Sequence, residues 1–376
     1  MLAIIGGSLF TGAKLIKKGT LLVDEGKIIA VGSVDIPNNA RIIEIPGKII
    51  TPGLIDAHSH LGATQEGVNW QEADINEATD PVTSQVRIID AINPKDPGFK
   101  DAVQGGVTCV QVLPGSANVV CGVGAIVKTH GRVVEEMLLE KSSGLKIAFG
   151  ENPKREHGRN KRLPSTRMGS AALLRQTLAK AHDYQNKDDK KRDLQLEPIV
   201  DVLKRKMPLR AHAHRSDDIV TALRIAIEFD LDITIEHCTE GHEIPDILRQ
   251  AKVSCAVGPT LSSRSKLELA NMSWQTVVAL DAAGVPVCLI TDHPVVPIGY
   301  LSICGALAVR EGLSWEKALA AITINPARHL GIDNRVGSLD PGKDADFIIW
   351  DGSDPFHYRT KVERTFINGI EVFARE

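Results

Sequence analysis

Two histidines lie two residues apart in the segment from Thr51 to His60, at the end of a short apolar run. Residues i and i+2 of a strand point to the same face, so His58 and His60 can direct both imidazoles towards one ion. A single His-x-His pair is equally compatible with two polar residues at a strand end. The other histidines and carboxylates of the chain are what favour a metal site.

Further side chains of the kinds that bind metals follow other short apolar runs. They are Glu151, His212, His214, His237, Asp292 and His293. Nitrogen and carboxylate ligands that converge from several strands suit Zn²⁺ or a similar divalent ion, with an open position for water if the site is catalytic. So many suitable side chains in equivalent positions argue against a purely structural role for the whole set.

The elements that must bring these side chains together follow a β/α pattern. From residue 50 to about 335, apolar runs of strand length alternate with helical stretches, as in a parallel sheet wrapped by helices. The strand candidates are Gly53 to His58, Val107 to Leu113, Leu145 to Gly150, Pro208 to Ala213, Asp232 to His237, Val253 to Val257 and Val287 to Thr291. One further strand is expected before residue 107. Eight such units predict a (β/α)8 TIM barrel, in which chemistry takes place at the C-terminal ends of the strands.

Both ends of the chain are rich in strand patterns. Short strands separated by turns fill the first fifty residues, and the pattern returns after Gly337. We therefore predict an α/β fold in which residues 1–50 and 337–376 form one small β-sandwich domain. Residues 51–336 form the barrel domain.

The composition is that of an ordinary soluble globular protein. The chain has 376 residues, of which 43% are hydrophobic and 24% charged, and its formal net charge is −3. This charge argues against nucleic acid or a membrane surface as a partner. The six cysteines lack Cys-x-x-Cys spacing and mostly lie in apolar runs. With no signal-peptide pattern and no run of membrane-spanning length, we expect a cytoplasmic protein.

The chain resembles the amidohydrolase superfamily of metal-dependent hydrolases, specifically its imidazolonepropionase-like branch. The resemblance covers nearly the whole length. Besides the histidines after the fifth and sixth predicted strands, it rests on Pro52 to His60, Thr291 to Pro294, Ile324 to Gly331 and Gly337 to Ile349. It implies one or two divalent metals per chain, with Zn²⁺ favoured, and a small-molecule substrate. It also allows a homo-oligomer.

The resemblance also implies roles for individual residues. His58 and His60 are expected to hold one metal, and Asp292 to touch the metal and to handle a proton. After the fifth strand the resemblance favours His212 as the ligand, with His214 as a bystander. After the sixth strand His237 is preferred to His242, which lies five residues further on in a loop.

The fourth predicted strand departs from the commonest binuclear pattern of this superfamily, in which a carboxylated lysine bridges two metals. Glu151 stands at the end of this strand and is the predicted bridging ligand. Lys154, three residues later, is the competing candidate. If neither coordinates, the remaining side chains would support a single ion.

The expected chemistry follows from these ligands. A bound divalent metal lowers the pKa of its water to about 7, which gives a hydroxide, and it polarises a substrate carbonyl. Asp292 would act as general base towards the metal-bound hydroxide and return the proton to the leaving nitrogen. His293 either orients Asp292 or packs beneath the site. The predicted function is hydrolysis of a C–N bond in an amide, cyclic amide, N-acyl amino acid or dipeptide.

Two alternatives and three further residues complete the predictions. Deamination of a small amidine-type ring is the nearest chemical alternative. A non-catalytic scaffold is the other, and it should lack an essential ligand such as Asp292. Asn118, in a loop of small residues after the third predicted strand, is a candidate for substrate binding. Arg155 and Arg215 follow the fourth and fifth strands, where a cation can bind a substrate carboxylate.

Overall fold

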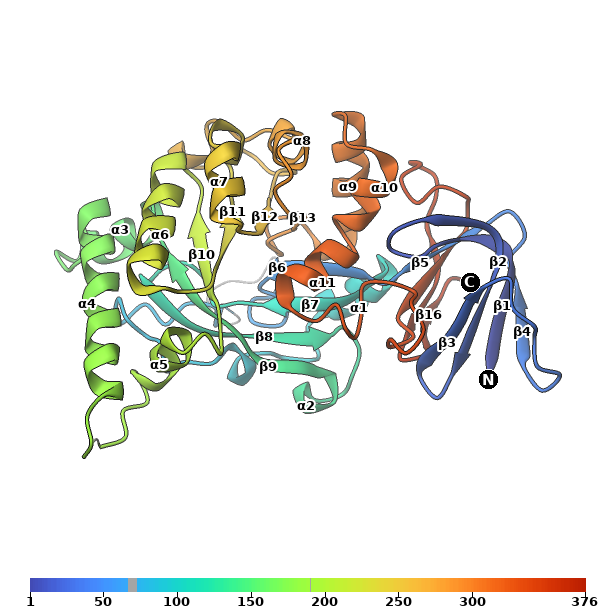
Figure 1. Ribbon diagram of the computed structural model, residues 1–376, viewed down its shortest axis with the longest axis horizontal. Coiled ribbons are helices and arrows are strands. Elements are labelled where there is room, and N and C mark those ends of the chain that lie inside the picture. The colour runs from blue at the N-terminus through green and yellow to red at the C-terminus, as the bar shows by residue number, and fades with distance from the viewer. Residues whose placement is uncertain (67–72, 190) are drawn as a thin grey trace.

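The computed structural model describes residues 1–66, 73–189 and 191–376, and it places their strands in two sheets (Figure 1). The strands of the small sheet are β1 (Leu2–Phe10), β2 (Leu15–Asp24), β3 (Lys27–Gly32), β4 (Arg41–Glu44), β5 (Ile49–Pro52), β14 (Phe347–Trp350), β15 (Val362–Ile367) and β16 (Ile370–Ala374). The strands of the barrel sheet are β6 (Leu54–Ser59), β7 (Val107–Val112), β8 (Val120–Lys128), β9 (Leu138–Ala148), β10 (Leu209–Ala213), β11 (Ile233–His237), β12 (Cys255–Val257) and β13 (Val287–Leu289).

Most helices belong to the barrel and lie between its strands in sequence. They are α1 (Pro97–Gln104), α2 (Val134–Met137), α3 (Glu151–Arg159), α4 (Arg167–Gln185), α5 (Glu197–Leu203), α6 (Ser216–Phe229), α7 (Pro245–Ala251), α8 (Gln275–Ala282), α9 (Leu301–Arg310), α10 (Trp315–Ala320) and α11 (Ile324–Leu330). Short 3-10 helices are η2 (Ile88–Asp90), η3 (Gly241–Glu243), η4 (Leu267–Leu269) and η5 (Ile298–Tyr300). The apolar face of α6, with Ile219, Leu223 and Ala226, is buried because an amphipathic helix packs its apolar stripe on the sheet.

The barrel sheet has the strand order β13-β12-β11-β10-β9-β8-β7-β6. Strands β9 to β13 are parallel, whereas β8 is antiparallel to both β7 and β9. The expectation of a further strand before residue 107 was therefore wrong, since the described residues between β6 and β7 form no strand and the missing one is β8. All nine residues of β8 are buried, so it lacks the polar–apolar alternation that marks a strand in sequence.

The two edges of the barrel sheet are joined by backbone hydrogen bonds at the ends that carry the candidate ligands. The Asp292 N–H donates to the His58 carbonyl at 3.1 Å, and the His60 N–H donates to the His293 carbonyl at 2.9 Å. The sheet is thus a nearly closed eight-stranded barrel, which confirms the predicted fold class. The same bonds fix the segment after β13 against the segment after β6.

The small sheet combines both ends of the chain, as predicted. Its order is β16-β15-β14-β5-β1-β2-β3, with β4 beside β1, and β14 pairs antiparallel with β5. Figure 1 shows both termini at this end of the molecule. A separate apolar cluster fills the sheet, and within it Phe347 and Phe366 stack with ring centroids 4.4 Å apart. The sheet therefore has a core of its own beside the barrel.

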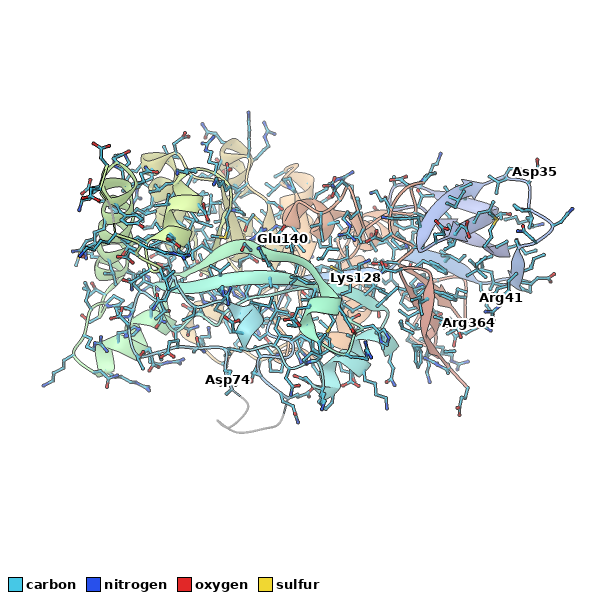
Figure 2. The ribbon with its side chains drawn as sticks, turned by 90° about the horizontal axis from the view of Figure 1, so that it is seen from below. Asp35, Arg41, Asp74, Lys128, Glu140 and Arg364 are labelled. Atoms are coloured by element: carbon cyan, nitrogen blue, oxygen red, sulfur yellow. The ribbon has the colours of Figure 1, made fainter. Side chains whose placement is uncertain are left out.

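A buried ionic cluster joins the small sheet to the barrel. Lys128, at the end of β8, donates to Asp344 at 2.9 Å, to Asp346 at 2.6 Å and to Asn368 at 2.9 Å. Figure 2 shows Lys128 at the junction of the two parts. A buried ammonium that reaches three oxygen atoms is well compensated, so this contact holds the small sheet in one position.

Among the described helices, none is long and apolar enough to span a membrane.

Candidate metal centre

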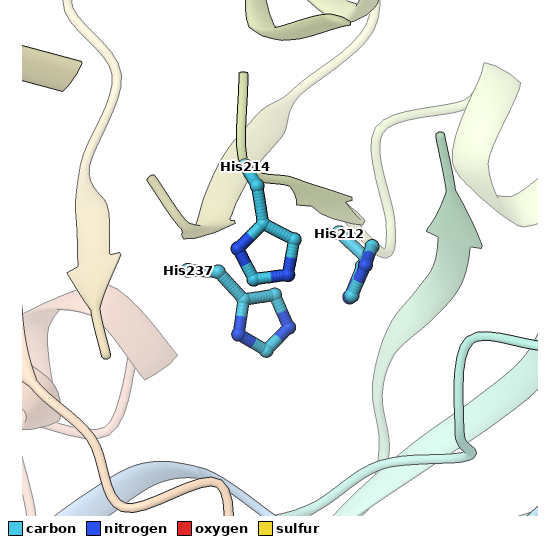
Figure 3. A group of neighbouring side chains, drawn as sticks. All are labelled: His212, His214 and His237. Atoms are coloured by element: carbon cyan, nitrogen blue, oxygen red, sulfur yellow. The ribbon is translucent and has the colours of Figure 1, made fainter. Parts of the chain in front are cut away.

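Five histidines and one aspartate converge at one end of the barrel, as the sequence predicts for strand ends. The ring of His237 lies 4.7 Å from His58, 4.3 Å from His212 and 4.7 Å from His214, measured between centroids. Figure 3 shows His212 and His214 from the end of β10 facing His237 from the end of β11. His237 is therefore the middle of the group.

The backbone at the end of β11 lets two consecutive residues serve this group. Successive side chains of a regular strand point to opposite faces, yet Glu236 and His237 both contact His58. His237 has a φ of 72°, outside the β region, so the alternation ends there. Asp292, which follows β13, also has a positive φ, of 53°.

Hydrogen bonds to the Nδ1 atoms orient three of the rings. The acceptors are Glu236 Oε2 for His58 at 2.9 Å, the Leu113 carbonyl for His60 at 2.8 Å and the Gly258 carbonyl for His237 at 3.0 Å. Since these partners are oxygen acceptors, each Nδ1 carries the proton and each Nε2 keeps its lone pair. This arrangement is typical of histidines that bind a metal through Nε2.

Asp292 presents further electron pairs to these nitrogen atoms. Its Oδ1 lies 3.2 Å from His60 Nε2 and 3.5 Å from His58 Nε2. Burial alone would raise the pKa of Asp292, but the neighbouring histidines, with His237 first, hold it well below its usual range. Lone pairs that face one another in a buried site repel unless a cation lies between them. The donor set therefore fits a divalent metal.

Two groups of three side chains offer ligand atoms within 4.8 Å of one another, and they share His237. One consists of His58, His237 and Asp292, and the other of His212, His214 and His237. Both ring nitrogens of His212, and the Nε2 atoms of His214 and His237, are buried without a hydrogen-bond partner. The chemistry of these atoms suits a cation, and because only Nε2 of His237 is available, His237 can bind the cation of one group at a time. His214, which the sequence left as a bystander, belongs to the second group.

Lys146 lies at the bottom of the same group. It belongs to β9, is completely buried, and has its Nζ 3.0 Å from His58 Nε2. Among the described residues it forms no ion pair with a carboxylate. Burial lowers the pKa of its amine by more than nearby groups such as Asp292 and Glu236 raise it. Lys146 is thus a buried amine with a lowered pKa, directed at His58.

Glu151 and Lys154, the two bridging candidates from sequence, lie elsewhere. Glu151 begins α3 on the far side of Glu268, and its Oε1 accepts the Glu268 N–H at 3.1 Å. Neither residue lines the pocket at the histidines. These positions do not fit a bridging ligand, because β9 ends two residues before α3 begins and the chain has already turned away. The position is occupied by Lys146, within the strand.

A second layer of polar side chains supports the histidines from the barrel interior. Glu236 is fully buried, and besides His58 it accepts hydrogen bonds from His329 at 3.1 Å and Thr234 at 2.7 Å. Burial works to raise the pKa of Glu236, but His329 and His58 hold it well below the usual range. Glu236 therefore remains a carboxylate and fixes the His58 ring.

The histidines open into a pocket of about 500 Å³. One wall comes from the segment after β12, where Lys266 and three serines line the space, and another contains Asn152, whose amide donates to Ser116 at 2.8 Å. Behind the first wall lies Glu268, only 1% exposed, with its Oε1 3.7 Å from His214 Nε2 and 3.9 Å from His212 Nε2. A pocket of this size accepts a small organic molecule.

The four residues proposed from sequence for substrate contact do not line this pocket. Both the nitrogen and the oxygen of the Asn118 amide have hydrogen-bond partners inside the protein. The nitrogen donates to the Glu77 carbonyl and to Thr83, and the oxygen accepts from His157. His293 is buried beneath the site, where its Nδ1 accepts the Ile298 N–H at 3.1 Å. Two roles were considered for His293, to orient Asp292 or to pack beneath the site. This position agrees with packing beneath the site.

The two arginines lie nearer the surface. Arg215 pairs with Asp217 at 2.8 Å and is 37% exposed. Arg155 is exposed and contacts Asn152 at 3.5 Å, a residue that does line the pocket. Their side chains are thus solvated at or beyond the rim, and the structure brings neither of them to the histidines.

Four side chains that lie at the site were missed in the sequence: Lys146, Glu236, Lys266 and Glu268. Lys146 had a signal, since a lone lysine inside a run of buried strand residues is costly unless it has a purpose. Glu236 directly precedes His237 and lies on the same face of β11 as Thr234, from which it accepts a hydrogen bond. Lys266 and Glu268 lie in an irregular segment, where no periodicity indicates a direction.

The fold and the donor set together define a class, the metal-dependent barrel hydrolases. A model of the amidohydrolase family matches residues 49–372. The chain therefore belongs to the amidohydrolase family, and the resemblance inferred from its motifs is confirmed.

Relatives of several kinds share the sequence over most of the chain. An amidohydrolase from Hapsidospora irregularis is 28% identical, over 98% of this chain and 40% of that protein, so the chain spans less than half of that relative. An imidazolonepropionase from Rhizorhabdus wittichii is 25% identical over 92% of this chain and 90% of that protein. These relatives support a hydrolase that acts on C–N bonds and leave the substrate open.

Solved structures share the fold. An amidohydrolase from Thermotoga maritima is 42% identical and superposes with a TM-score of 0.97 over the full length of both chains. A Xaa-Pro dipeptidase superposes with a TM-score of 0.60 at 16% identity, over 98% of this chain and 99% of that one. At that identity the likeness concerns the fold alone.

Proposed function

We propose that this protein hydrolyses a C–N bond in a small amide, cyclic amide, N-acyl amino acid or dipeptide, with a divalent metal held by the converging histidines. The observation that supports this most directly is the set of buried, unpartnered Nε2 atoms of His212, His214 and His237, in a pocket of about 500 Å³ that Asp292 also lines. When bound, Zn²⁺ or a similar ion would polarise the carbonyl and acidify a water molecule. Every other step falls to side chains of the chain.

Asp292 is the proposed proton acceptor. Its Oδ1 has no hydrogen-bond donor and its carboxylate stays ionised, because the histidines hold its pKa well below the usual range against the effect of burial. It lines the pocket, so it can reach a water that attacks the substrate carbonyl. The same carboxyl group can then deliver the proton to the departing nitrogen.

Lys146 is the proposed bridging group, in place of Glu151. Its amine has a lowered pKa and lies 3.0 Å from His58, so it can react with carbon dioxide. The nitrogen then forms a bond to the carbon, a proton is released, and a carbamate anion results. Its two oxygen atoms would add the negative charge that five neutral histidines lack. The carbamate would also remove the cost of a buried amine.

The first experiment tests metal, carbamate and activity together. Metal per chain is measured by plasma mass spectrometry in the native protein and in Lys146→Met, Glu151→Gln and Asp292→Asn. Carbon-13 NMR with labelled bicarbonate looks for a carbamate. Activity is release of free amine from a panel of N-acetyl amino acids, dipeptides and cyclic amides. The expected result is two metals per chain in the native protein, less metal in both Lys146→Met and Asp292→Asn, and loss of the carbamate signal only in Lys146→Met.

Controls separate the parts of this proposal. Glu151→Gln is the matched control, since Glu151 lies outside the histidine group, and it should keep both metal and activity. Metal retained in Lys146→Met with no carbamate signal in the native protein would contradict the bridging role. Bound metal with no amine release from any amide, but ammonia release from amino-substituted rings, would favour the deaminase alternative. An adenine deaminase from Clostridium perfringens is 25% identical over 96% of this chain.

A further inference from the structure

Lys266 is the more exposed of two lysines that line the pocket. The described residues that line this space include two lysines, Lys146 at the floor and Lys266 on the wall after β12. Lys146 is completely buried against His58, whereas the Lys266 side chain is 22% exposed. Lys266 is therefore the lysine that keeps an accessible charge inside the pocket.

Glu268 fixes the position of Lys266 and leaves further N–H donors of the Lys266 ammonium group for a ligand. The Lys266 Nζ lies 3.1 Å from Glu268 Oε1, and Glu268 Oε2 accepts the Glu151 N–H at 2.9 Å. An ammonium has three N–H donors, and Glu268 Oε1 is the acceptor that the structure assigns to Lys266. Glu268 is 1% exposed and cannot follow a ligand. A second acceptor can approach Lys266 from the pocket that it lines.

The surroundings of Lys266 suit a charged end of a small molecule. Ser262, Ser263 and Ser265 line the same wall, and hydroxyl groups beside an ammonium form a typical carboxylate site. Leu269 and Val295 add apolar surface to the same pocket. A pocket of about 500 Å³ holds a molecule of dipeptide size.

We propose that Lys266 binds a carboxylate of the substrate, so that this protein acts on acidic amides such as N-acyl amino acids, dipeptides or cyclic amides that carry a carboxylate. This inference rests on the proposed function and restricts its substrate class. The carboxylate lies on the wall after β12, and the carbonyl that reacts lies towards His237 and Asp292. Neutral amides lack the charge that Lys266 pairs with.

The test compares acids with neutral analogues. N-acetyl amino acids and dipeptides are assayed beside the same compounds as C-terminal N-methylamides, with the native protein, Lys266→Met and Lys266→Arg. Lys154→Met is the matched control, since Lys154 does not line the pocket. A charge-assisted hydrogen bond predicts that Lys266→Met raises KM for the acids about 10- to 100-fold, with a smaller change in kcat. Neutral analogues should be unaffected, and Lys266→Arg should retain most of the preference for acids.

Two results would overturn the inference. The first is an equal loss for acids and neutral analogues in Lys266→Met, which would mean that the lysine acts only by supporting Glu268. The second is a native protein with no preference for acids. If no compound is hydrolysed at all, the proposed function fails, and calorimetric binding of the same pairs to the metal-loaded protein then decides on Lys266. If the native protein binds the acids more tightly than their neutral analogues, and Lys266→Met loses this preference, the carboxylate site is supported even then. If the native protein shows no such preference, or Lys266→Met keeps it, the inference is overturned.

Discussion

Replacement of Glu236 should weaken metal binding although Glu236 is not itself expected to touch the metal. Its carboxylate accepts three buried hydrogen bonds, from His58 at 2.9 Å, His329 at 3.1 Å and Thr234 at 2.7 Å. In Glu236→Leu all three donors lose their acceptor inside the barrel. Each orphaned donor costs about 1–3 kcal/mol, and loss of one partner of a buried ionic contact typically costs about 3–5 kcal/mol in total.

The effect on the metal comes through the His58 ring. Without an acceptor at Nδ1, the ring is free to rotate or to place its proton on Nε2, which faces Asp292 and Lys146. Loss of such a supporting partner typically weakens metal binding about 10- to 100-fold. We therefore expect Glu236→Leu to lower both the stability of the metal-free protein and its affinity for Zn²⁺.

Glu236→Gln should be much milder, which makes it the informative comparison. The amide oxygen can accept from His58, and the amide nitrogen can donate to His329, provided that His329 carries its proton on Nδ1. That tautomer is available because His329 Nδ1 lies 2.8 Å from the Ser254 hydroxyl, which can accept. The loss then reduces to the difference between charged and neutral hydrogen bonds, about 1–2 kcal/mol.

The assays are urea denaturation of the metal-free protein and competition with a chelator for Zn²⁺. Glu135→Leu, at an exposed position, is the matched control and should change neither. If Glu236→Leu bound Zn²⁺ as tightly as the native protein, the Nδ1 contact would not orient His58 and the reasoning would be refuted. Equal damage from Gln and Leu would show that charge, not hydrogen bonding, is what Glu236 supplies.

Three further predictions concern pH, the domain junction and a loop. In metal-free protein, burial lowers the pKa of His58 and of His214 to about 4. Between pH 4 and about 6.5 the unfolded chain therefore binds more protons than the folded protein. The midpoint temperature of thermal unfolding should therefore fall as the pH falls from 6.5 towards 4. Lys128→Met removes the buried cation that pairs with both Asp344 and Asp346, of which Asp344 keeps Lys27 and Arg335. It should cost about 3–5 kcal/mol in urea, with Lys27→Met, at a side chain 48% exposed that pairs with Asp344 alone, as the milder control. Asn118→Ala should lower stability by about 1–3 kcal/mol and leave KM unchanged, and a specific rise in KM would restore the substrate-binding hypothesis.

Much of the architecture follows from the sequence because it depends on periodicity. The buried runs at His212 and His237 are short, apolar and bounded by turns, and their strands lie where the sequence predicts them. Strand β8 was missed because all its residues are buried and it contains glycines, so it has no alternating pattern. Its antiparallel direction also breaks the regular β/α repeat on which the prediction relied.

The identities of the residues at the strand ends were sufficient to predict a metal site. His58, His60, His212, His237 and Asp292 stand at the ends of strands in the sequence, and the closed sheet brings those ends together. Closure of the barrel alone determines this convergence, since all its parallel strands end at one face. Residue type and position at the end of a strand are both local properties, so both can be predicted from the sequence.

Only the tertiary structure determined which lysine and which glutamate side chains lie next to the histidines. Glu151 has the right position in sequence and lies outside the group, because the chain turns into α3 directly after β9. Lys146 lies inside β9 and reaches His58, Glu236 reaches His58 from within β11, and His237 joins them because its φ is positive. Side-chain direction at an irregular strand end depends on backbone angles and packing from other strands, which no local pattern in the sequence records.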